Sequence, residues 1–214
     1  MKKNVFWMIA LMLCFVCGAN AQTEDLFNGK DLSNWRFVVD GDKMPANEMY
    51  MIRDGAIHIQ GSSTIFGYMY TEKKYKDFTL ELEWKWIGEA TNSGIFMMIA
   101  EPKQGNAFPT AIECQLKGGD AGDFVMLSGS DLDEYVLPAS GRRPAFPVIK
   151  KRQDSNEKPV GEWNKAKIEV KDGKITIHIN GVLQNQATNK VKEGHIGLQS
   201  EGGPIQFRNL KISL

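Results

Sequence analysis

The sequence predicts an all-β protein, an antiparallel sandwich or barrel built from short strands. Two observations support this: short segments alternate apolar and polar residues, and tight-turn dipeptides separate them, with almost no helical spacing. The 214 residues suit one domain, and 42% hydrophobic with 24% charged residues is an ordinary globular composition. Because 26 basic residues balance 26 acidic ones, the broad basic surface of a nucleic-acid-binding protein is not expected.

The beginning of the chain has the features of a secretory signal peptide. Lys2 and Lys3 supply a positive start, and Val5–Cys17 is an uncharged apolar run. Ala19 and Ala21 place small residues at the two positions that a signal peptidase reads. The apolar run is too short to span a membrane comfortably. We therefore expect a cut after Ala21 and export to the periplasm or beyond.

The mature domain is expected to cover residues 22–214. A lipoprotein that uses Cys17 is the less favoured alternative, because the bulky Val16 precedes that cysteine. Residues 1–21 contain two lysines and no acidic residue, so the remainder carries 24 basic and 26 acidic residues, a net charge of −2. Only Cys114 then remains, which excludes an intramolecular disulfide and leaves stability to a hydrophobic core.

Alternation of apolar and polar residues defines the clearest strands. Residues 79–86 place two leucines and two tryptophans on one face and charged residues on the other, the pattern of a half-buried strand. Residues 165–170 and 174–180 repeat this pattern with isoleucine and valine. Turn signals of the type that closes a hairpin follow or separate such runs. These are Asp54-Gly55, Asp172-Gly173 and Asn180-Gly181.

One long stretch, residues 129–161, has no such pattern. It carries four prolines and many charges. Long loops in compact domains are often functional, although a simple surface excursion is the commoner case.

The segment 111–117 is the most informative for function. Strict alternation puts Glu113, Gln115 and Lys117 on one polar face, while Cys114 and its apolar neighbours occupy the other. An acid, an amide and a base spaced about 6–7 Å apart could line a sugar-sized cleft. An ordinary solvated outer face explains the same spacing, and both interpretations stay open.

Two further groups of polar residues are candidates. The glycine-rich turn after this strand carries Asp120 and Asp123, which suggests a close approach of backbone and carboxylates to another group. In residues 194–209, His195 and Glu201 share one face of an alternating run, and Glu201 precedes a glycine turn. A catalytic carboxylate and a carboxylate that binds turn amides fit Glu201 equally well.

Metal and aromatic signals are weaker. His58, His178 and His195 lack metal-ligand spacing, and one cysteine cannot build a zinc site, although the fold can still assemble a mixed site. Sugars stack on flat rings, and four aromatic residues lie near predicted loops, although core packing is the more typical role for each. These are Trp35, Tyr68, Phe124 and Trp163.

Five motifs in order resemble the 3-keto-disaccharide hydrolase family and together extend over nearly the whole mature chain. They are Leu26–Trp35, Thr91–Phe96, Ala111–Phe124, Asn156–Asn164 and Ile196–Leu210. The resemblance implies a concanavalin A-like jelly-roll β-sandwich of two antiparallel sheets. It also implies an exported protein, as in Bacteroidetes-type bacteria. Many members carry an arginine in place of Met98 and a histidine in place of Glu201, so this chain is expected in a separate branch.

The resemblance implies cleavage of a glycoside whose sugar is oxidised at C3. The ketone acidifies the C2 proton, a base removes it, the aglycone leaves C1, and water then adds. Such a site needs a base, a group that stabilises the enolate oxygen and an acid for the leaving group. The expected catalytic residues are Glu113 and Glu201, and the expected substrate ligands are Gln115, Lys117, His195 and Asp120, with His195 as an alternative acid.

Three alternatives accompany this hypothesis. A divalent ion, rather than Lys117, could stabilise the enolate, and no metal ligands are assigned. A retaining β-glucanase on the same fold is the least favoured alternative, because its E-x-D-x-x-E pattern lacks the middle and final acids after Glu113. A lectin-like module would bind an oligosaccharide without cleaving it. In every case the expected partner is a saccharide.

Overall fold

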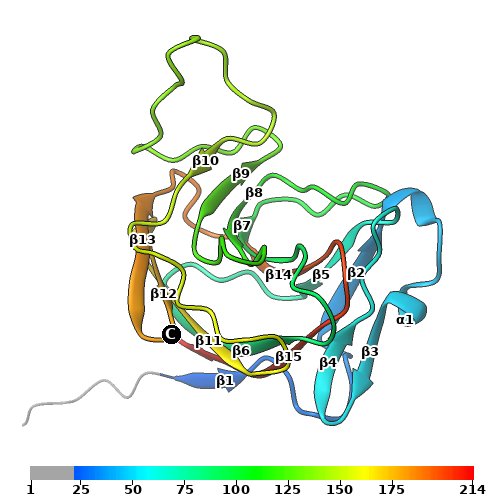
Figure 1. Cartoon of the computed structure of the whole chain (residues 1–214). Coiled ribbons are helices and arrows are strands. Elements are labelled where there is room, and N and C mark those ends of the chain that lie inside the picture. The colour runs from blue at the N-terminus through cyan, green and yellow to red at the C-terminus, as the bar shows by residue number, and fades with distance from the viewer. Residues whose placement is uncertain (1–21) are drawn as a thin grey trace, which may run out of the picture.

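The computed structural model describes residues 22–214 and is a sandwich of two antiparallel sheets (Figure 1). The eight-stranded sheet has the order β13 (Val182–Thr188), β12 (Lys174–Ile179), β11 (Asn164–Lys171), β6 (Phe78–Trp86), β15 (Ile205–Ser213), β4 (Ala56–Ile59) and β3 (Tyr50–Arg53), with β1 (Thr23–Asp25) paired to β15. The seven-stranded sheet has the order β10 (Val148–Ile149), β9 (Phe124–Leu127), β8 (Ala111–Gln115), β7 (Gly94–Ile99), β14 (His195–Ser200), β5 (Gly67–Thr71) and β2 (Trp35–Val39). A short 3-10 turn (Asp40–Asp42) and α1 (Ala46–Met49) connect β2 to β3.

The connections between the sheets make this a jelly roll, as the family resemblance implies. Within residues 22–214 the chain passes from one sheet to the other at eight connections, which are β1–β2, β2–β3, β4–β5, β5–β6, β6–β7, β10–β11, β13–β14 and β14–β15. As a result β14 lies between β7 and β5, while β15 lies between β6 and β4. The predicted concanavalin A-like sandwich is confirmed. The predicted signal peptide lies outside the described residues, and within residues 22–214 no helix has the length and apolar character that a membrane crossing requires.

The predicted hairpins are also confirmed. The three turn dipeptides join β3 to β4, β11 to β12 and β12 to β13. Both residues of each turn have positive φ, for example 48° at Asn180 and 83° at Gly181. This backbone geometry matches the twist of the paired strands and suits asparagine, aspartate and glycine.

The main core fills the space between the sheets. Trp84 and Phe207 of the first sheet belong to the same buried cluster as Ile112, Cys114 and Phe124 of the second. The prediction that Cys114 is a core residue is confirmed. Its burial raises the pKa of the thiol, so Cys114 stays neutral and is unsuited to act as a nucleophile.

The outer face of the seven-stranded sheet is buried as well. A second cluster of buried residues lies there, comprising Val38, Tyr68, Phe96, Ile99, Ala111, Val125 and Leu127. Phe108, from the connection between β7 and β8, packs against this cluster. The solvated-face interpretation of residues 111–117 is therefore wrong at Glu113, which is only 2% exposed.

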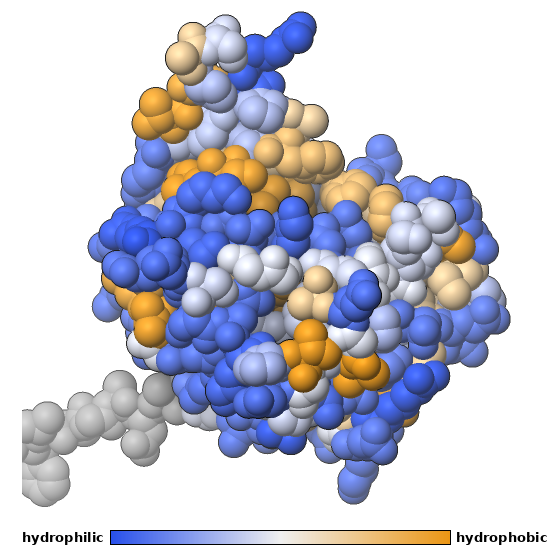
Figure 2. All heavy atoms as spheres, viewed as in Figure 1, coloured by the Kyte–Doolittle hydropathy of each residue, from blue (hydrophilic) through white to orange (hydrophobic). Residues whose placement is uncertain are grey.

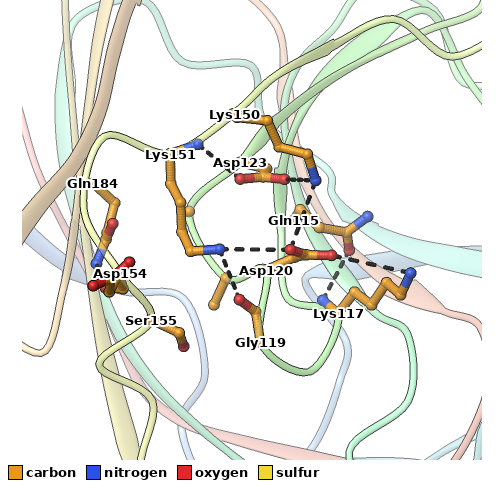
Figure 3. A network of polar contacts seen from close by, with 12 residues as sticks. Gln115, Lys117, Gly119, Asp120, Asp123, Lys150, Lys151, Asp154, Ser155 and Gln184 are labelled. Atoms are coloured by element: carbon orange, nitrogen blue, oxygen red, sulfur yellow. Dashed lines mark hydrogen bonds and ion pairs between the residues drawn. The ribbon is translucent and has the colours of Figure 1, made fainter.

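The long irregular stretch is tied to the turn between β8 and β9. Apart from β10, residues 129–161 form no regular strand or helix, and Figure 1 shows the segment between β9 and β10 rising above the sandwich. The buried Asp123 carboxylate accepts hydrogen bonds from Lys150 Nζ and from the backbone N–H of Lys151, both at 2.8 Å (Figure 3). The glycine-rich turn therefore approaches the chain's own long loop.

Candidate active site

A cleft of about 230 Å³ opens on the outer face of the seven-stranded sheet. Its lining residues are Asn92, Phe108, Glu113, Gln115, Val125, Leu127, Phe146, Val148, Gln199 and Glu201. A larger hollow of about 570 Å³ lies beside Gly119 and residues 150–155. We place the candidate site in the smaller cleft because it brings together two carboxyl groups whose pKa values are both raised.

Glu113 is the most deeply buried acid of this cleft. It lies on β8 opposite Phe96 of β7, and its side chain extends over Gly94, where no side chain competes for the space. Its Oε1 atom is buried and has no hydrogen-bond partner within residues 22–214. Burial, and secondarily the charge of Glu201, raise the pKa of Glu113 well above its usual value. The carboxyl group of Glu113 therefore keeps its proton to a higher pH than an ordinary glutamate does.

Glu201 follows directly after β14 and is less buried. Gln199 Nε2 donates a hydrogen bond to its Oε2 at 2.8 Å. Burial raises the pKa of Glu201, and a hydrogen bond from the Asn92 side chain opposes that shift. Two neighbouring carboxyl groups in unequal environments give up their protons at different pH values, which is the arrangement that assigns one acid and one base.

Three oxygen atoms of this cleft are buried acceptors without a partner within residues 22–214. They belong to Asn92 (Oδ1), Glu113 (Oε1) and Gln199 (Oε1). Buried polar atoms in folded proteins are nearly always hydrogen-bonded, so these three oxygens need partners from outside the described residues, either water molecules or a ligand that donates hydrogen bonds. The hydroxyl groups of a sugar meet this requirement.

Gln115 supplies a donor at the same place. Its Oε1 accepts hydrogen bonds from the backbone N–H groups of Leu116 at 3.0 Å and Lys117 at 2.9 Å. These contacts fix the orientation of the amide, and Figure 3 shows its nitrogen pointing away from the neighbouring lysines and aspartates. The two hydrogens on Nε2 are therefore available to a ligand in the cleft.

Lys117 and Asp120 do not reach the cleft. The expected polar face ends early because β8 stops at Gln115, and the backbone of Gly118 then bonds to Thr91. Lys117 is exposed, with Nζ 4.0 Å from Asp120, and Asp120 also lies 3.5 Å from Lys151 Nζ (Figure 3). The expectation that Lys117 continues the face of Glu113 is wrong, because the chain turns before it.

His195 is placed away from Glu201. It begins β14, whereas Glu201 follows the end of that strand, a separation of roughly 20 Å at about 3.3 Å per residue. Its Nδ1 lies 2.8 Å from the carbonyl oxygen of Thr71, and its ring meets Tyr70 edge-on at 5.3 Å between centroids. Of the six site residues predicted from the sequence, the cleft thus collects Glu113, Gln115 and Glu201.

The comparisons with known proteins agree with this architecture. A family described as the 3-keto-alpha-glucoside-1,2-lyase-like domain matches residues 22–213. The chain belongs to this family. The match confirms the resemblance stated from the five motifs, and the lyase-like domain extends over all the strands described above.

One sequence relative and two solved structures are similar to this chain. The 3-keto-disaccharide hydrolase of Bacteroides thetaiotaomicron is 28% identical, with 88% of this chain and 77% of that protein aligned. A crystal structure of a "putative glycosyl hydrolase" from Parabacteroides distasonis has a TM-score of 0.63 at 23% identity, covering 89% of this chain and 93% of that one. A carbohydrate binding module from Bacillus subtilis has a TM-score of 0.58 at 14% identity, covering 83% and 94%. Both structures share the fold of this chain.

Several cleft residues of this lyase-like domain were not singled out from the sequence. Gln199 had a signal, because it alternates with His195 and Glu201, and Asn92 lies within a motif of the family. No sequence signal marked Phe108 or Phe146, since both lie in irregular segments whose position depends on tertiary contacts.

The aromatic candidates from the sequence lie elsewhere. Trp35, Tyr68 and Phe124 are fully buried, as the core interpretation expected. Trp163 belongs to the surface of the other sheet, where Arg208 lies 3.9 Å and Lys85 4.8 Å from its ring. The rings that line the cleft are Phe108 and Phe146.

No metal centre is evident in the described part of the chain. Among residues 22–214, no three His, Cys, Asp or Glu side chains are grouped so that they could hold an ion. The cleft itself offers two carboxyl groups and the amide oxygens of Asn92 and Gln199.

Proposed function

We propose that this domain cleaves the glycosidic bond of 3-keto-glycosides by elimination followed by hydration. The observation that carries the proposal is the pair of carboxyl groups, Glu113 and Glu201, whose pKa values are both raised in one cleft. Membership of the lyase-like family and the name of the Bacteroides relative support the substrate class. The fold alone does not indicate catalysis, because sandwiches of this kind also bind sugars without cleaving them.

The first half of the reaction uses both acids and the Gln115 amide. Glu201, the more exposed carboxylate, removes the C2 proton, whose acidity comes from the C3 ketone. The negative charge that develops on the C3 oxygen accepts a hydrogen bond from Gln115 Nε2. Glu113 donates its proton to the glycosidic oxygen, the C1–O bond breaks, and the aglycone leaves as an alcohol.

The second half reverses the proton transfers. Glu113, now ionised, takes a proton from a water molecule as the water oxygen bonds to C1. Glu201 returns its proton to C2, which restores the 3-keto sugar and both starting protonation states. The net reaction consumes one water molecule, and no cofactor is oxidised or reduced.

The test compares 4-nitrophenyl 3-keto-glucoside with the unoxidised 4-nitrophenyl glucoside, following nitrophenol release. We expect release only from the keto compound, and deuterium from D2O at C2 of the sugar product. Glu113→Gln and Glu201→Gln should each lose about 10²–10⁴-fold in turnover, while the exposed Glu193→Gln should not. Release from the unoxidised glucoside would indicate a conventional glycosidase, and binding without product would indicate a carbohydrate-binding module.

We further propose that the domain acts after export. The charge, apolar run and small residues of positions 1–21 support this. Mass spectrometry of the protein from its native host should find Gln22 as the first residue, and an intact Met1 would contradict the proposal.

A further inference from the structure

The cleft has a polar half and an apolar half. The polar lining comes from β8, from the end of β14 with the residue after it, and from the segment that leads into β7; it consists of Asn92, Glu113, Gln115, Gln199 and Glu201. The apolar lining consists of Phe108, Val125, Leu127, Phe146 and Val148. The strand register places the boundary at Glu113: Val125 is its partner on β9, and Val148 is the partner of Val125 on β10. At about 4.8 Å between strands, Val148 lies roughly 10 Å from Glu113.

Two phenylalanines complete the apolar half. The rings of Phe108 and Phe146 lie 5.3 Å apart between centroids at an angle of 53°. Phe146 remains 46% exposed and Val148 39% exposed. Figure 2 shows apolar side chains gathered where the long loop leaves the body of the molecule. Exposed apolar surface continuous with a polar site commonly marks a place where a ligand binds.

Hydrogen bonds anchor the backbone next to each ring. The N–H of Phe108 donates to Asn106 Oδ1 at 3.1 Å, and its carbonyl oxygen accepts from Ser128 Oγ at 2.6 Å. Phe146 directly precedes Pro147, whose carbonyl oxygen accepts from the N–H of Met126 at 2.9 Å. The backbone that carries these rings is therefore ordered before a ligand arrives, which lowers the entropic cost of binding.

We propose that this apolar half holds the aglycone, so that the preferred substrates are 3-keto-glycosides of aromatic or similarly apolar alcohols. The inference rests on the proposed function, in which Glu113 protonates the glycosidic oxygen. With that oxygen at Glu113, the aglycone extends over Val125 and Val148 toward the Phe146 ring. A second sugar can stack a C–H face on one of these rings, but its hydroxyl groups would meet side chains that cannot hydrogen-bond to them, so we expect it to bind less tightly than an aromatic aglycone.

Benzyl and methyl 3-keto-glucosides, in both anomers, test the proposal, because both aglycones leave as simple alcohols and differ mainly in the ring. We expect the wild type to favour the benzyl compound in kcat/KM, and Phe146→Ala to reduce the benzyl-to-methyl ratio about tenfold. The matched control is Val136→Ala, since Val136 is 82% exposed on the same loop and does not line the cleft. A ratio that Phe146→Ala leaves unchanged, or a preference for 3-keto-cellobiose over the benzyl compound, would overturn the inference.

A binding measurement separates this inference from the proposed function. If no 3-keto-glycoside is cleaved, the proposed chemistry fails. Calorimetry with benzyl and methyl glucosides then still tests whether the apolar half of the cleft binds an aromatic aglycone. Tighter binding of the benzyl glucoside that disappears in Phe146→Ala would support it. Equal affinities in the wild type would reject it.

Discussion

The carboxyl group of Glu113 lies over Gly94 on the neighbouring strand. A methyl group at Gly94 would stand 2.7 Å from both Cγ and Cδ of Glu113, well inside van der Waals contact. Both residues belong to motifs identified in the sequence, and the pairing of β7 with β8 brings them together. The space above this glycine therefore accommodates the acid in its buried position.

Gly94→Ala is expected to displace Glu113 and to lower both activity and stability. The clash involves the outer part of the Glu113 side chain, so relief requires the carboxyl group to leave its buried position, and overpacking of this kind typically costs about 1–3 kcal/mol. Turnover of a 3-keto-glucoside should fall by at least tenfold, with a lower Tm. Gly88→Ala is the matched control, because a Cβ there meets nothing within 4 Å. Full activity of Gly94→Ala would show that the position of Glu113 is unimportant.

The pH dependence of kcat/KM should be bell-shaped. Activity needs Glu201 ionised and Glu113 protonated, and burial raises the pKa of both groups, further for Glu113. The acid limb should belong to Glu201 and the alkaline limb to Glu113. In the residual activity of Glu113→Gln the alkaline limb should be missing, while the acid limb persists. Loss of the acid limb in that variant would reverse the roles assigned to the two carboxyl groups.

Stability should also depend on Glu113. Its pKa in the folded state is raised above the usual 4.5, so the folded protein keeps a proton that the unfolded chain loses as pH rises. The free energy of unfolding should therefore decrease above about pH 4.5, by about 1.4 kcal/mol per pH unit until the folded pKa is reached. Denaturant unfolding of the wild type and Glu113→Gln at several pH values measures this. Parallel pH profiles for the two proteins would contradict the burial argument.

Gln115 and Lys117 should differ sharply in their effect on catalysis. Gln115→Glu keeps an acceptor for the N–H groups of Leu116 and Lys117 but removes the donor, so kcat should fall about 10²-fold with little change in Tm. Lys117→Ala should change kcat/KM by less than twofold, because the ammonium group lies outside the cleft. A large loss in Lys117→Ala would restore the sequence-based role of that lysine.

Asp123 should affect stability and substrate binding by holding the long loop of residues 129–161 in position. Its carboxylate holds Lys150 and the backbone of Lys151, next to β10. Asp123→Asn keeps one acceptor oxygen, so either the exposed Lys150 ammonium group or the N–H of Lys151 loses its partner, and the buried amide NH2 group gains none. We expect a cost of about 1–3 kcal/mol and a higher KM for aromatic substrates, because Val148 would move. The control is Asp133→Asn, whose exposed carboxylate lies 3.7 Å from Lys190. An unchanged Tm and KM in Asp123→Asn would show that the loop is held by other contacts.

Local pattern determined the strands, their buried faces and the hairpins of this protein. A period of two residues is imposed by the pleat itself, so alternation in residues 79–86 identified the face on which Leu80 to Trp86 are buried. Asparagine, aspartate and glycine adopt positive φ easily, so the Asp-Gly and Asn-Gly dipeptides were enough to predict the hairpin turns. The same alternation predicted that Cys114 is a core residue. The five motifs, in their order along the chain, identified the family.

Only the tertiary structure decided which polar residues share a cleft. Glu113 is buried because loops cover the outer face of its sheet, and alternation carries no information about what lies above a face. Lys117 lies outside the cleft because β8 ends before it. The position of that end depends on hydrogen bonds to the Gln115 side chain and to the carbonyl oxygen of Thr91, which is distant in the sequence. Phe146 reaches the cleft because β10 pairs with β9, a contact between segments that the pattern of neither one predicts.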